Sequence, residues 1–298
     1  MIMKKQIDVL LVSYNQSQYI QQTLESIMMQ RLDDDVQMRI IVADDCSTDG
    51  TLDIIKTYAL KHKAEWVFLP NEKNMGHVRN YQRAFDACKG DYVAILEGDD
   101  YWSSPLHLQT HVDFMDVHRE CVLSSQYPTW YYEEEQRFDP RALSQLPFGN
   151  YKYVTIEEEI HANRIVNLSS CVIRGEAIRT LDERIFECSV LDWPMYVNLC
   201  QKGLLCLLTG TTSVYRAKSS GLYAGLSKET ELQKDEQLLG EIEKIFPQYA
   251  DSYAKSRRLM HPRPKSTGRK MAECILWPFA QIGKLCSRMH LIYKEVKK

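Results

Sequence analysis

The chain has 298 residues, 44% of them hydrophobic, so it is long enough and apolar enough to bury a full core. Its formal net charge is only −3, and no interleaving of basic and aromatic residues indicates nucleic-acid binding. The nine cysteines are odd in number and form no CxxC pair, and no signal peptide precedes Ile7, so we expect a reduced, cytoplasmic compartment.

The first predicted unit is a strand followed by a helix. Residues 7–14 (IDVLLVSY) are apolar and rich in β-formers, and apolar residues at helical spacing predict a helix over 18–30. The turn between them has neither the GxGxxG of dinucleotide folds nor the GxxxxGK[ST] of P-loops, which disfavours a dehydrogenase or a P-loop NTPase. Tyr14, at the carboxyl end of the strand, could stack on a nucleotide base or be an ordinary strand-end tyrosine.

A second predicted strand ends in acidic residues. Residues 38–45 (MRIIVADD) finish with Asp44 and Asp45. Asp49 follows at a position where its side chain can cap a helix predicted over 51–62. Capping accounts for Asp49, but it does not account for two further carboxylates at a strand end.

The next predicted elements are a strand at 66–69 and a helix over 78–89. Arg79 and Arg83 lie four positions apart on one face of this helix. One of them could meet the acidic residues or a phosphate, and Arg79 enters the predicted donor site. The other is expected to be solvated.

The stretch GDYVAILEGDDYW (90–102) joins a buried strand to a cluster of acids. The apolar run within 91–96 is typical of a central parallel strand, and Glu97, Asp99 and Asp100 follow it. Burying several acids at a strand end is unfavourable unless a positive charge lies there. The cluster is either a solvated acidic turn or the site of a hard divalent cation with a bound phosphate.

Four segments in order resemble the signature of family 2 glycosyltransferases: VSYNQSQYIQQTLESIMMQ, IVADDCSTDGT, NMGHVRNYQRAF and GDYVAILEGDDYW. The resemblance runs from about residue 7 to residue 115, with weaker echoes to about residue 221. It implies the α/β GT-A fold, in which helices flank a nucleotide-binding mixed sheet, here with a C-terminal helical extension. It also implies a nucleotide-sugar donor.

The resemblance assigns roles to residues already named. The base and ribose of the donor fall to Tyr14 and to Asp44 or Asp45. The stretch Glu97–Asp99 takes the place of the family's DxD motif, with Glu97 where many relatives have Asp. Asp99, with Asp100 as a second candidate, would reach a Mn²⁺ or Mg²⁺ ion on the diphosphate.

A helix after Pro105 carries two histidines. His107 and His111 lie four residues apart, a spacing that can bind a metal. No third ligand is evident, so exposed helix histidines are the favoured interpretation.

The following segment combines short elements with an irregular stretch. Strands are predicted at 120–127 and 168–173, and 155–158 (TIEE) is a capping box that opens a short helix. The aromatic and acidic stretch 128–150 is interpreted as a long loop of the kind that covers a substrate.

Asp192 precedes Trp193 at the start of a predicted helix, where a carboxylate can simply favour the helix dipole. The resemblance places Asp192 at the family's general base, although Leu191 stands where relatives carry Glu. The resemblance also identifies residues 213–221 as a late loop that closes over the donor. Arg216 and Lys218 would there face the diphosphate.

The end of the chain is strongly basic. From residue 255 onward there are 12 Lys and Arg against 2 Asp and Glu, and residues 271–296 carry apolar residues at helical spacing. Such a helix either lies on an anionic membrane or packs back on the protein. No run of about 18 apolar residues predicts a membrane-spanning helix.

We therefore expect a glycosyltransferase domain at 1–225, with a donor half to about 117 and an acceptor half from 118, then a helical extension at 226–256 and a basic tail at 257–298. By resemblance, the chain would be an inverting, metal-dependent enzyme. It would move a sugar, in first place from a UDP-sugar, to a glycan or lipid-linked acceptor in cell-surface polysaccharide synthesis. The alternatives are a non-catalytic nucleotide-sugar-binding protein and a nucleotidyltransferase, whose glycine-rich basic loop is missing after the first strand.

Overall fold

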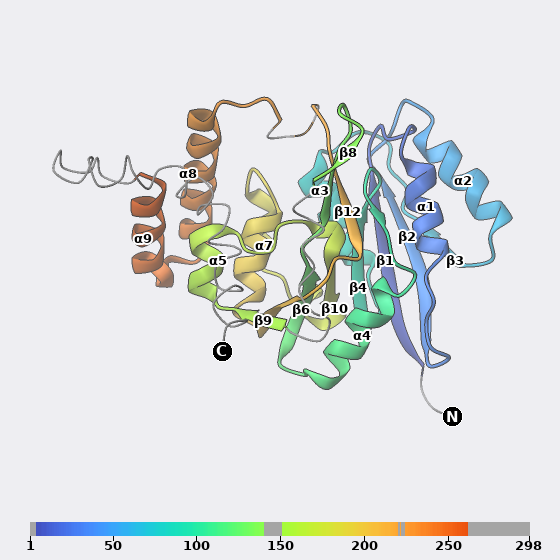
Figure 1. The fold of residues 1–298 in the computed structure, drawn as a ribbon, viewed down its shortest axis with the longest axis horizontal. Coiled ribbons are helices and arrows are strands. Elements are labelled where there is room, and N and C mark those ends of the chain that lie inside the picture. The colour runs from blue at the N-terminus through green and yellow to red at the C-terminus, as the bar shows by residue number, and fades with distance from the viewer. Residues whose placement is uncertain (1–3, 140–150, 220, 222–223, 262–298) are drawn as a thin grey trace. The chain divides into compact units, whose positions relative to one another are not determined.

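The described residues form a central eight-stranded mixed sheet (Figure 1). The structure is a computed structural model and describes residues 4–139, 151–219, 221 and 224–261. In spatial order the strands are β3 (Glu65–Phe68), β2 (Val36–Asp44), β1 (Lys5–Ser13), β4 (Tyr92–Glu97), β10 (Cys171–Arg174), β6 (Cys121–Gln126), β11 (Leu204–Leu208) and β9 (Tyr151–Val154). The mixed α/β class predicted from the sequence is confirmed.

The strands of this sheet run in one direction, except β10 and β9, which are antiparallel to their neighbours. The carboxyl ends of β1, β2 and β4 therefore meet at one edge, where ligands bind in open α/β sheets. The register fixes which side chains meet there, because Ser13 is opposite Asp44 and Val12 is opposite Glu97.

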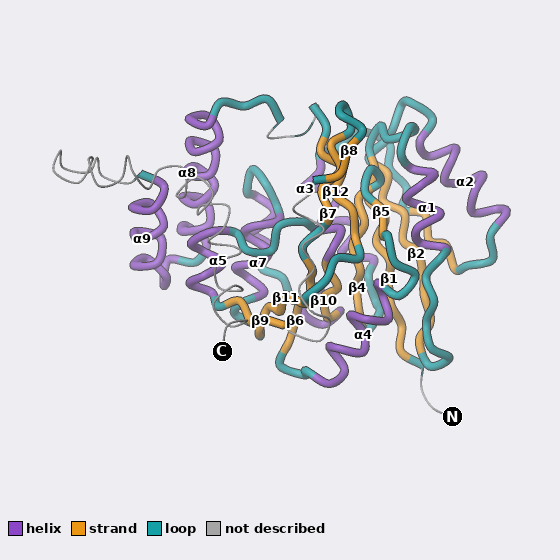
Figure 2. Tube along the Cα trace, in the orientation of Figure 1, coloured by secondary structure: helices purple, strands orange, loops and turns teal. Residues whose placement is uncertain are grey.

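Helices cover both faces of the sheet. They are α1 (Ile20–Met28), α2 (Thr51–Lys61), α3 (His77–Ala87), α4 (His107–Val117), α5 (Ile156–Ala162), α6 (Gly175–Ile178), α7 (Asp192–Leu199), α8 (Lys228–Ile245) and α9 (Ala250–Met260), with 3₁₀ turns at Leu168–Ser170, Glu183–Glu187 and Pro247–Tyr249. Figure 2 shows the strands in orange, with α1 and α2 to one side and α5 and α7 to the other.

Alternation along β1 explains the layers. Ile7, Val9 and Leu11 form one buried cluster with apolar residues of α1 and α4. The intervening Leu10 points to the opposite face, where α3 packs on β1 and β2. Every residue of β1 from Ile7 to Ser13 is buried, which is the pattern of a strand covered on both faces.

A smaller four-stranded sheet, also within the described residues, has the order β5 (Tyr101–Trp102), β12 (Ser213–Ala217), β7 (Thr129–Tyr132) and β8 (Arg137–Phe138). We predicted loops at 128–150 and 213–221. That prediction is wrong where β7, β8 and β12 form strands. The central pair is parallel and joins residues 85 positions apart along the chain, with Val214 opposite Thr129. No local pattern could reveal such a pair, because strand propensity depends on the partner strand.

The two histidines of α4 are also not where we expected. His107 and His111 are both fully buried, and each Nδ1 meets a hydroxyl, that of Thr212 at 2.6 Å and that of Ser124 at 2.7 Å. Burial lowers the pKa of His111 to about 3, so its imidazole is neutral. They are core residues that anchor α4 to neighbouring strands.

The chain divides into two units, one of residues 1–256 and one that begins at Arg257. Residues 257–260, predicted as part of a linker, continue α9 instead. Within the described part of the chain, no helix combines the length and hydrophobicity needed to cross a membrane. The predicted amphipathic helix at 271–296 lies outside the described residues.

Candidate active site

The acidic pair at the end of β2 holds two loops in place. Asp44 accepts hydrogen bonds from Ser13 Oγ at 2.9 Å and from the backbone N–H and hydroxyl of Ser47 at 2.8 and 2.6 Å. Asp45 accepts from Asn71 Nδ2 at 2.9 Å and from the backbone N–H of Met75 and Gly76, which open α3. A carboxylate accepts about four hydrogen bonds. Each of these two therefore has an acceptor position left over, although both residues are only 3% exposed.

Tyr14 follows β1 and is 46% exposed, so its ring is accessible beside this pair. Asp49 accepts from the backbone N–H of Thr51, the first residue of α2, at 3.0 Å, but the N-cap is Gly50, so neither Asp49 nor Ser47 is the cap that we predicted. Asp49 also accepts a bond from the N–H of Ser17. Partial burial opposes the shift, but these bonds lower the pKa of Asp49 to about 2.

Of the two arginines on α3, Arg83 reaches the strand ends. Its guanidinium donates to the backbone carbonyls of Pro70 at 2.6 Å and Asp44 at 3.2 Å. Arg79 is exposed, and its Nη1 donates to Gln82 on the same helix at 2.6 Å. Arg79 thus keeps a free face for a ligand, whereas Arg83 is committed to the loops.

The acids after β4 have different surroundings. Glu97 accepts from the hydroxyl of Tyr81 at 3.0 Å, and burial followed by the charges of Asp100 and Asp99 raises its pKa to about 8. Asp100 is buried, and its two oxygens accept from the Asn167 amide at 3.1 Å and the Arg216 backbone N–H at 2.9 Å. Burial, followed by the charge of Asp99, raises the pKa of Asp100 to about 7.

Asp99 is the acid of this group that forms an ion pair. Its Oδ2 lies 2.5 Å from the Nζ of Lys218, and the two side chains are 18% and 15% exposed. The late segment predicted from the sequence therefore does reach the acids of β4, although it does so from the end of strand β12.

Arg216 lies between the two sheets as a hub. Its guanidinium donates to the Asp99 carbonyl at 2.8 Å and to Gln22 at 2.6 Å, and it forms an ion pair with Glu133. Three rings surround the guanidinium, with centroids at 4.7, 5.4 and 5.8 Å, those of Tyr19, Tyr131 and Tyr101. Arg216 is only 7% exposed, so its contacts are with the protein.

Asp192 begins α7 and accepts from the backbone N–H of Trp193 at 2.8 Å. Burial raises its pKa, and hydrogen bonds from the backbone N–H of Trp193 and from Asn163 oppose the shift. The indole of Trp193 donates to the Glu159 carbonyl at 2.9 Å, which ties the start of α7 to α5. This carboxyl is thus held at a fixed position with an increased proton affinity, as a general base requires.

Several residues of the site were not predicted. Tyr19 and Gln22 lie at the start of α1, Glu133 follows β7, and Asn167 precedes a 3₁₀ turn. None has a spacing that marks it, because each belongs to a separate element. The one available signal was Tyr19, the second tyrosine of SYNQSQY in the first motif.

The fit of a divalent cation can be tested on these contacts. Across the described ranges, no group of three His, Cys, Asp or Glu side chains is arranged to hold a metal ion. Asp100 is only 1% exposed, whereas the side chain of Asp99 is 18% exposed, which leaves Asp99 as the better ligand. One carboxylate with substrate phosphates and water is a usual environment for Mg²⁺, so Asp99 fits this ion.

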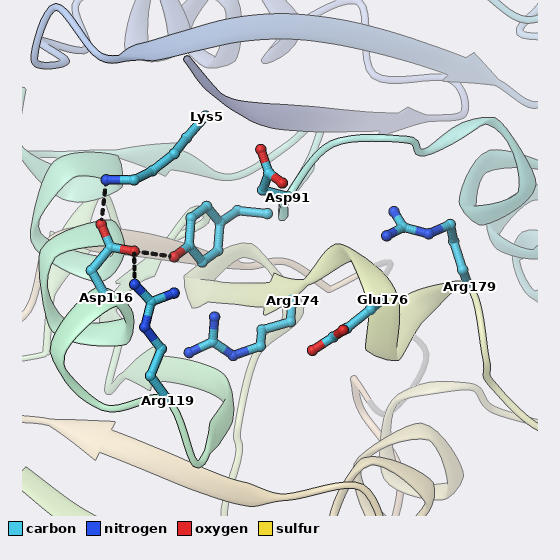
Figure 3. A pocket seen from close by; sticks show the side chains of 8 residues that line it. Lys5, Asp91, Asp116, Arg119, Arg174, Glu176 and Arg179 are labelled. Carbon is cyan, nitrogen blue, oxygen red and sulfur yellow. Dashed lines mark hydrogen bonds and ion pairs between the residues drawn. The ribbon is translucent and has the colours of Figure 1, made fainter. Parts of the chain in front are cut away.

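A separate polar cavity of about 220 Å³ lies at the opposite end of β1 and β4 (Figure 3). Lys5 pairs there with Oδ2 of Asp116, while Arg119 approaches Oδ1, which also accepts from the Tyr92 hydroxyl at 2.6 Å. It contains none of the predicted site residues. Arg174 and Arg179 donate to the backbone carbonyls of Cys121 and Gly90, so these groups stabilise this end of the sheet.

Comparison with known proteins identifies relatives of this chain. The family model described as glycosyl transferase family 2 matches residues 8–169. An uncharacterized protein of Mycobacterium tuberculosis is 29% identical over 212 residues, which cover 71% of this chain and 59% of that protein. The putative teichuronic acid biosynthesis glycosyltransferase TuaG of Bacillus subtilis is 34% identical over 122 residues, which cover 41% of this chain and 46% of TuaG.

The chain thus spans less than two thirds of the length of these two relatives. Escherichia coli WfaP, named a UDP-Glc:alpha-D-GlcNAc-diphosphoundecaprenol beta-1,3-glucosyltransferase, is 25% identical over 228 residues, which cover 75% of this chain and 82% of that protein.

Two solved structures share the fold. S. aureus TarS 1–349 with UDP-GlcNAc has a TM-score of 0.61 at 20% identity, and covers 80% of this chain and 66% of its own. Mannosyltransferase PcManGT from Pyrobaculum calidifontis, with GDP-Man and Mn²⁺, has a TM-score of 0.61 at 15% identity. The match covers 87% of this chain and 71% of PcManGT. Since the family model matches more than half of the residues, this chain belongs to glycosyl transferase family 2.

Proposed function

We propose that this chain transfers a sugar from a nucleotide-sugar donor, in first place a UDP-sugar, to a hydroxyl of a glycan or lipid-linked acceptor. One observation carries the proposal: the acids after β4 lie at the edge where β1, β2 and β4 end, in a chain that the model of glycosyl transferase family 2 matches over more than half its length. The candidate base Asp192 is close enough to this group for its charge to help raise the pKa of Glu97, after burial and the charges of Asp100 and Asp99.

Donor recognition is assigned to the edge formed by β1, β2 and β4. Tyr14 would stack on the base, and the open lone pairs of Asp44 and Asp45 would accept hydrogen bonds from the base and ribose. Arg79 and Lys218 would face the diphosphate. Asp99 would hold Mn²⁺ or Mg²⁺, which supplies a counter-charge to the departing diphosphate.

The proposed chemistry is one in-line displacement with inversion. Asp192 takes the proton of the acceptor hydroxyl while that oxygen forms a bond to the anomeric carbon. The bond from this carbon to the nucleotide oxygen breaks, and the nucleoside diphosphate departs with the electron pair. The raised pKa of Asp192 strengthens it as a proton acceptor.

The acceptor class is inferred from relatives. TuaG and WfaP are named for teichuronic acid biosynthesis and for transfer to a diphosphoundecaprenol carrier. A similar acceptor would lie at a membrane, and the basic residues after 255 offer an attraction to its anionic inner surface. We therefore propose cytoplasmic action in surface-polysaccharide synthesis.

Donor binding is the first test. The thermal midpoint is measured with UDP-, GDP- and dTDP-sugars, with and without Mn²⁺, for the parent, Asp99→Asn and the exposed control Asp34→Asn. We expect one nucleotide to raise the midpoint only with Mn²⁺, in the parent and Asp34→Asn but not in Asp99→Asn. Equal stabilisation of all three proteins would refute the role of Asp99. Donor binding without any sugar transfer would favour a non-catalytic binding protein.

A further inference from the structure

The ion pair between Lys218 and Asp99 occupies the carboxylate that the proposed function gives to the divalent cation. The Nζ to Oδ2 distance is 2.5 Å, and both side chains are more than four-fifths buried. A buried pair is less screened by water than a surface pair, so Lys218 is a serious competitor for this oxygen.

The backbone that carries Lys218 is held on both sides of this residue. Two residues earlier, Arg216 is fixed by the hub of contacts described above. One residue later, the N–H of Ser219 donates to Glu134 Oε1 at 2.6 Å. The ring of Tyr19 lies 4.9 Å from Nζ and shapes its surroundings. Removing the ammonium from Asp99 therefore requires movement of one side chain and leaves the strand in place.

We propose that Lys218 and the divalent cation compete for Asp99, so that the cation binds tightly only together with the nucleotide diphosphate. An ammonium and a divalent ion repel each other and cannot share one carboxylate oxygen. Diphosphate oxygens offer Lys218 another anion, and its transfer to them frees Asp99 for the metal. Lys218 thereby couples the two ligands. This inference rests on the proposed function, because it takes the nucleotide as the second ligand.

Competition for Asp99 can be distinguished from a role in which Lys218 only contacts the donor diphosphate. If Lys218 only contacted the diphosphate, its removal would weaken nucleotide binding and leave binding of the metal alone unchanged. If it competes, its removal strengthens binding of the metal alone and weakens nucleotide binding. Because coupling is reciprocal, the factor by which each ligand improves the other falls in the variant.

The experiment measures free Mn²⁺ by electron paramagnetic resonance during titration of the full-length protein, with and without UDP. Lys218→Ala removes the ammonium, and Lys218→Met keeps most of the side-chain volume in case alanine disturbs the fold. Lys152→Ala is the matched control. Lys152 lies on β9, away from the site, and its Nζ pairs with Glu158 of α5 at 2.6 Å. Asp99→Asn reports whether Asp99 binds the metal.

We expect both Lys218 variants to bind Mn²⁺ without UDP at least about fivefold more tightly than the parent, within the usual range of coupling. Lys152→Ala should match the parent, and the enhancement of Mn²⁺ binding by UDP should shrink in the Lys218 variants. Unchanged or weaker binding of Mn²⁺ alone in both Lys218 variants would overturn the competition. Failure of UDP to bind any protein would instead contradict the proposed function, and the arm without nucleotide would still test the competition.

Discussion

Arg216 fixes the main chain of Asp99, since its Nε donates a 2.8 Å hydrogen bond to the Asp99 carbonyl oxygen. The backbone N–H of Arg216 also donates to the side chain of the neighbouring Asp100. The loop after β4 is therefore attached twice to β12, and the carboxylate of Asp99 is left to exchange partners. Arg216 was predicted to face the diphosphate. Its observed contacts favour a supporting role beneath the acids.

Replacing Arg216 by Lys should destabilise the protein by about 2–4 kcal/mol, because one ammonium cannot serve the acceptors that the guanidinium binds and leaves buried groups unpaired. Urea unfolding would measure the change. Arg137→Lys is the control, since Arg137 is exposed, pairs with Glu135 and lies over the ring of Tyr132, so this change should cost under about 1 kcal/mol. Equal effects of the two changes would mean that the hub contributes nothing special.

Asp192→Asn should lower turnover by about 10²- to 10⁴-fold and leave donor affinity almost unchanged, because it removes a general base and keeps the shape. The raised pKa of Asp192 gives the parent a further signature. A base works deprotonated, so turnover should fall on acidification at a higher pH than an ordinary aspartate, near 3.9, would give. A steady-state pH profile checks this. Near-normal turnover of the variant would reduce Asp192 to a helix-start residue.

Glu159 should make stability depend on pH. Burial raises its pKa from 4.5 to about 8, so the folded state binds a proton between these values that the unfolded chain releases. The contribution of Glu159 to the free energy of unfolding is therefore fully present below about pH 4.5. It declines as the pH rises to 8, by at most about 1.4 kcal/mol per pH unit. Glu159→Gln should make this decline shallower in urea unfolding, with the remainder due to Glu97 and Asp100, whereas the exposed Glu157→Gln should leave it unchanged. A parent whose stability is constant over this range would disprove the assignment.

Two glycines should respond in opposite directions to alanine. A Cβ on Gly175 would lie 1.9 Å from the carbonyl oxygen of Gly90, so Gly175→Ala must push two backbones apart, at a cost of about 3 kcal/mol or more. Gly240 lies inside α8 with nothing within 4 Å, and alanine there should add about 0.5–1 kcal/mol. Thermal midpoints of the two variants should move apart; a shared direction would contradict this account.

The basic tail should attach the protein to anionic membranes. Each Lys or Arg near such a surface contributes about 1 kcal/mol, and salt screens the attraction. A chain ending at Arg269 should still bind nucleotide but should no longer sediment with phosphatidylglycerol vesicles, and high salt should release the full-length protein. If the truncated chain sediments as well as the full-length one, the tail does not carry the attachment.

The sequence predicted the first half of the fold closely because its signals are local. Apolar runs such as the one before Asp44 and helical spacing before Met28 place elements within about two residues of β2 and α1. The same holds for the acids after β4, whose pattern depends on neighbours in the chain. These residues indicated a binding edge before any contact was known.

The rest depended on contacts between distant segments. Glu133 and Arg216 meet across 83 residues, and Gln22 and Arg216 across 194, so neither pairing leaves a periodic trace. The burial of His107 and His111 likewise requires Thr212 and Ser124, polar partners that lie beyond the helix. Such contacts exist only after the strands are assembled.

The place of β10 has a consequence for synthesis on the ribosome. This strand pairs with β4 on one side and β6 on the other, yet it follows both in the chain by tens of residues. A nascent chain that has emerged only to residue 170 exposes unpaired edges on β4 and β6, which can recruit other chains. Until β10 arrives the two parts of the sheet cannot join. The first 117 residues are therefore a poor choice for expression as a separate fragment.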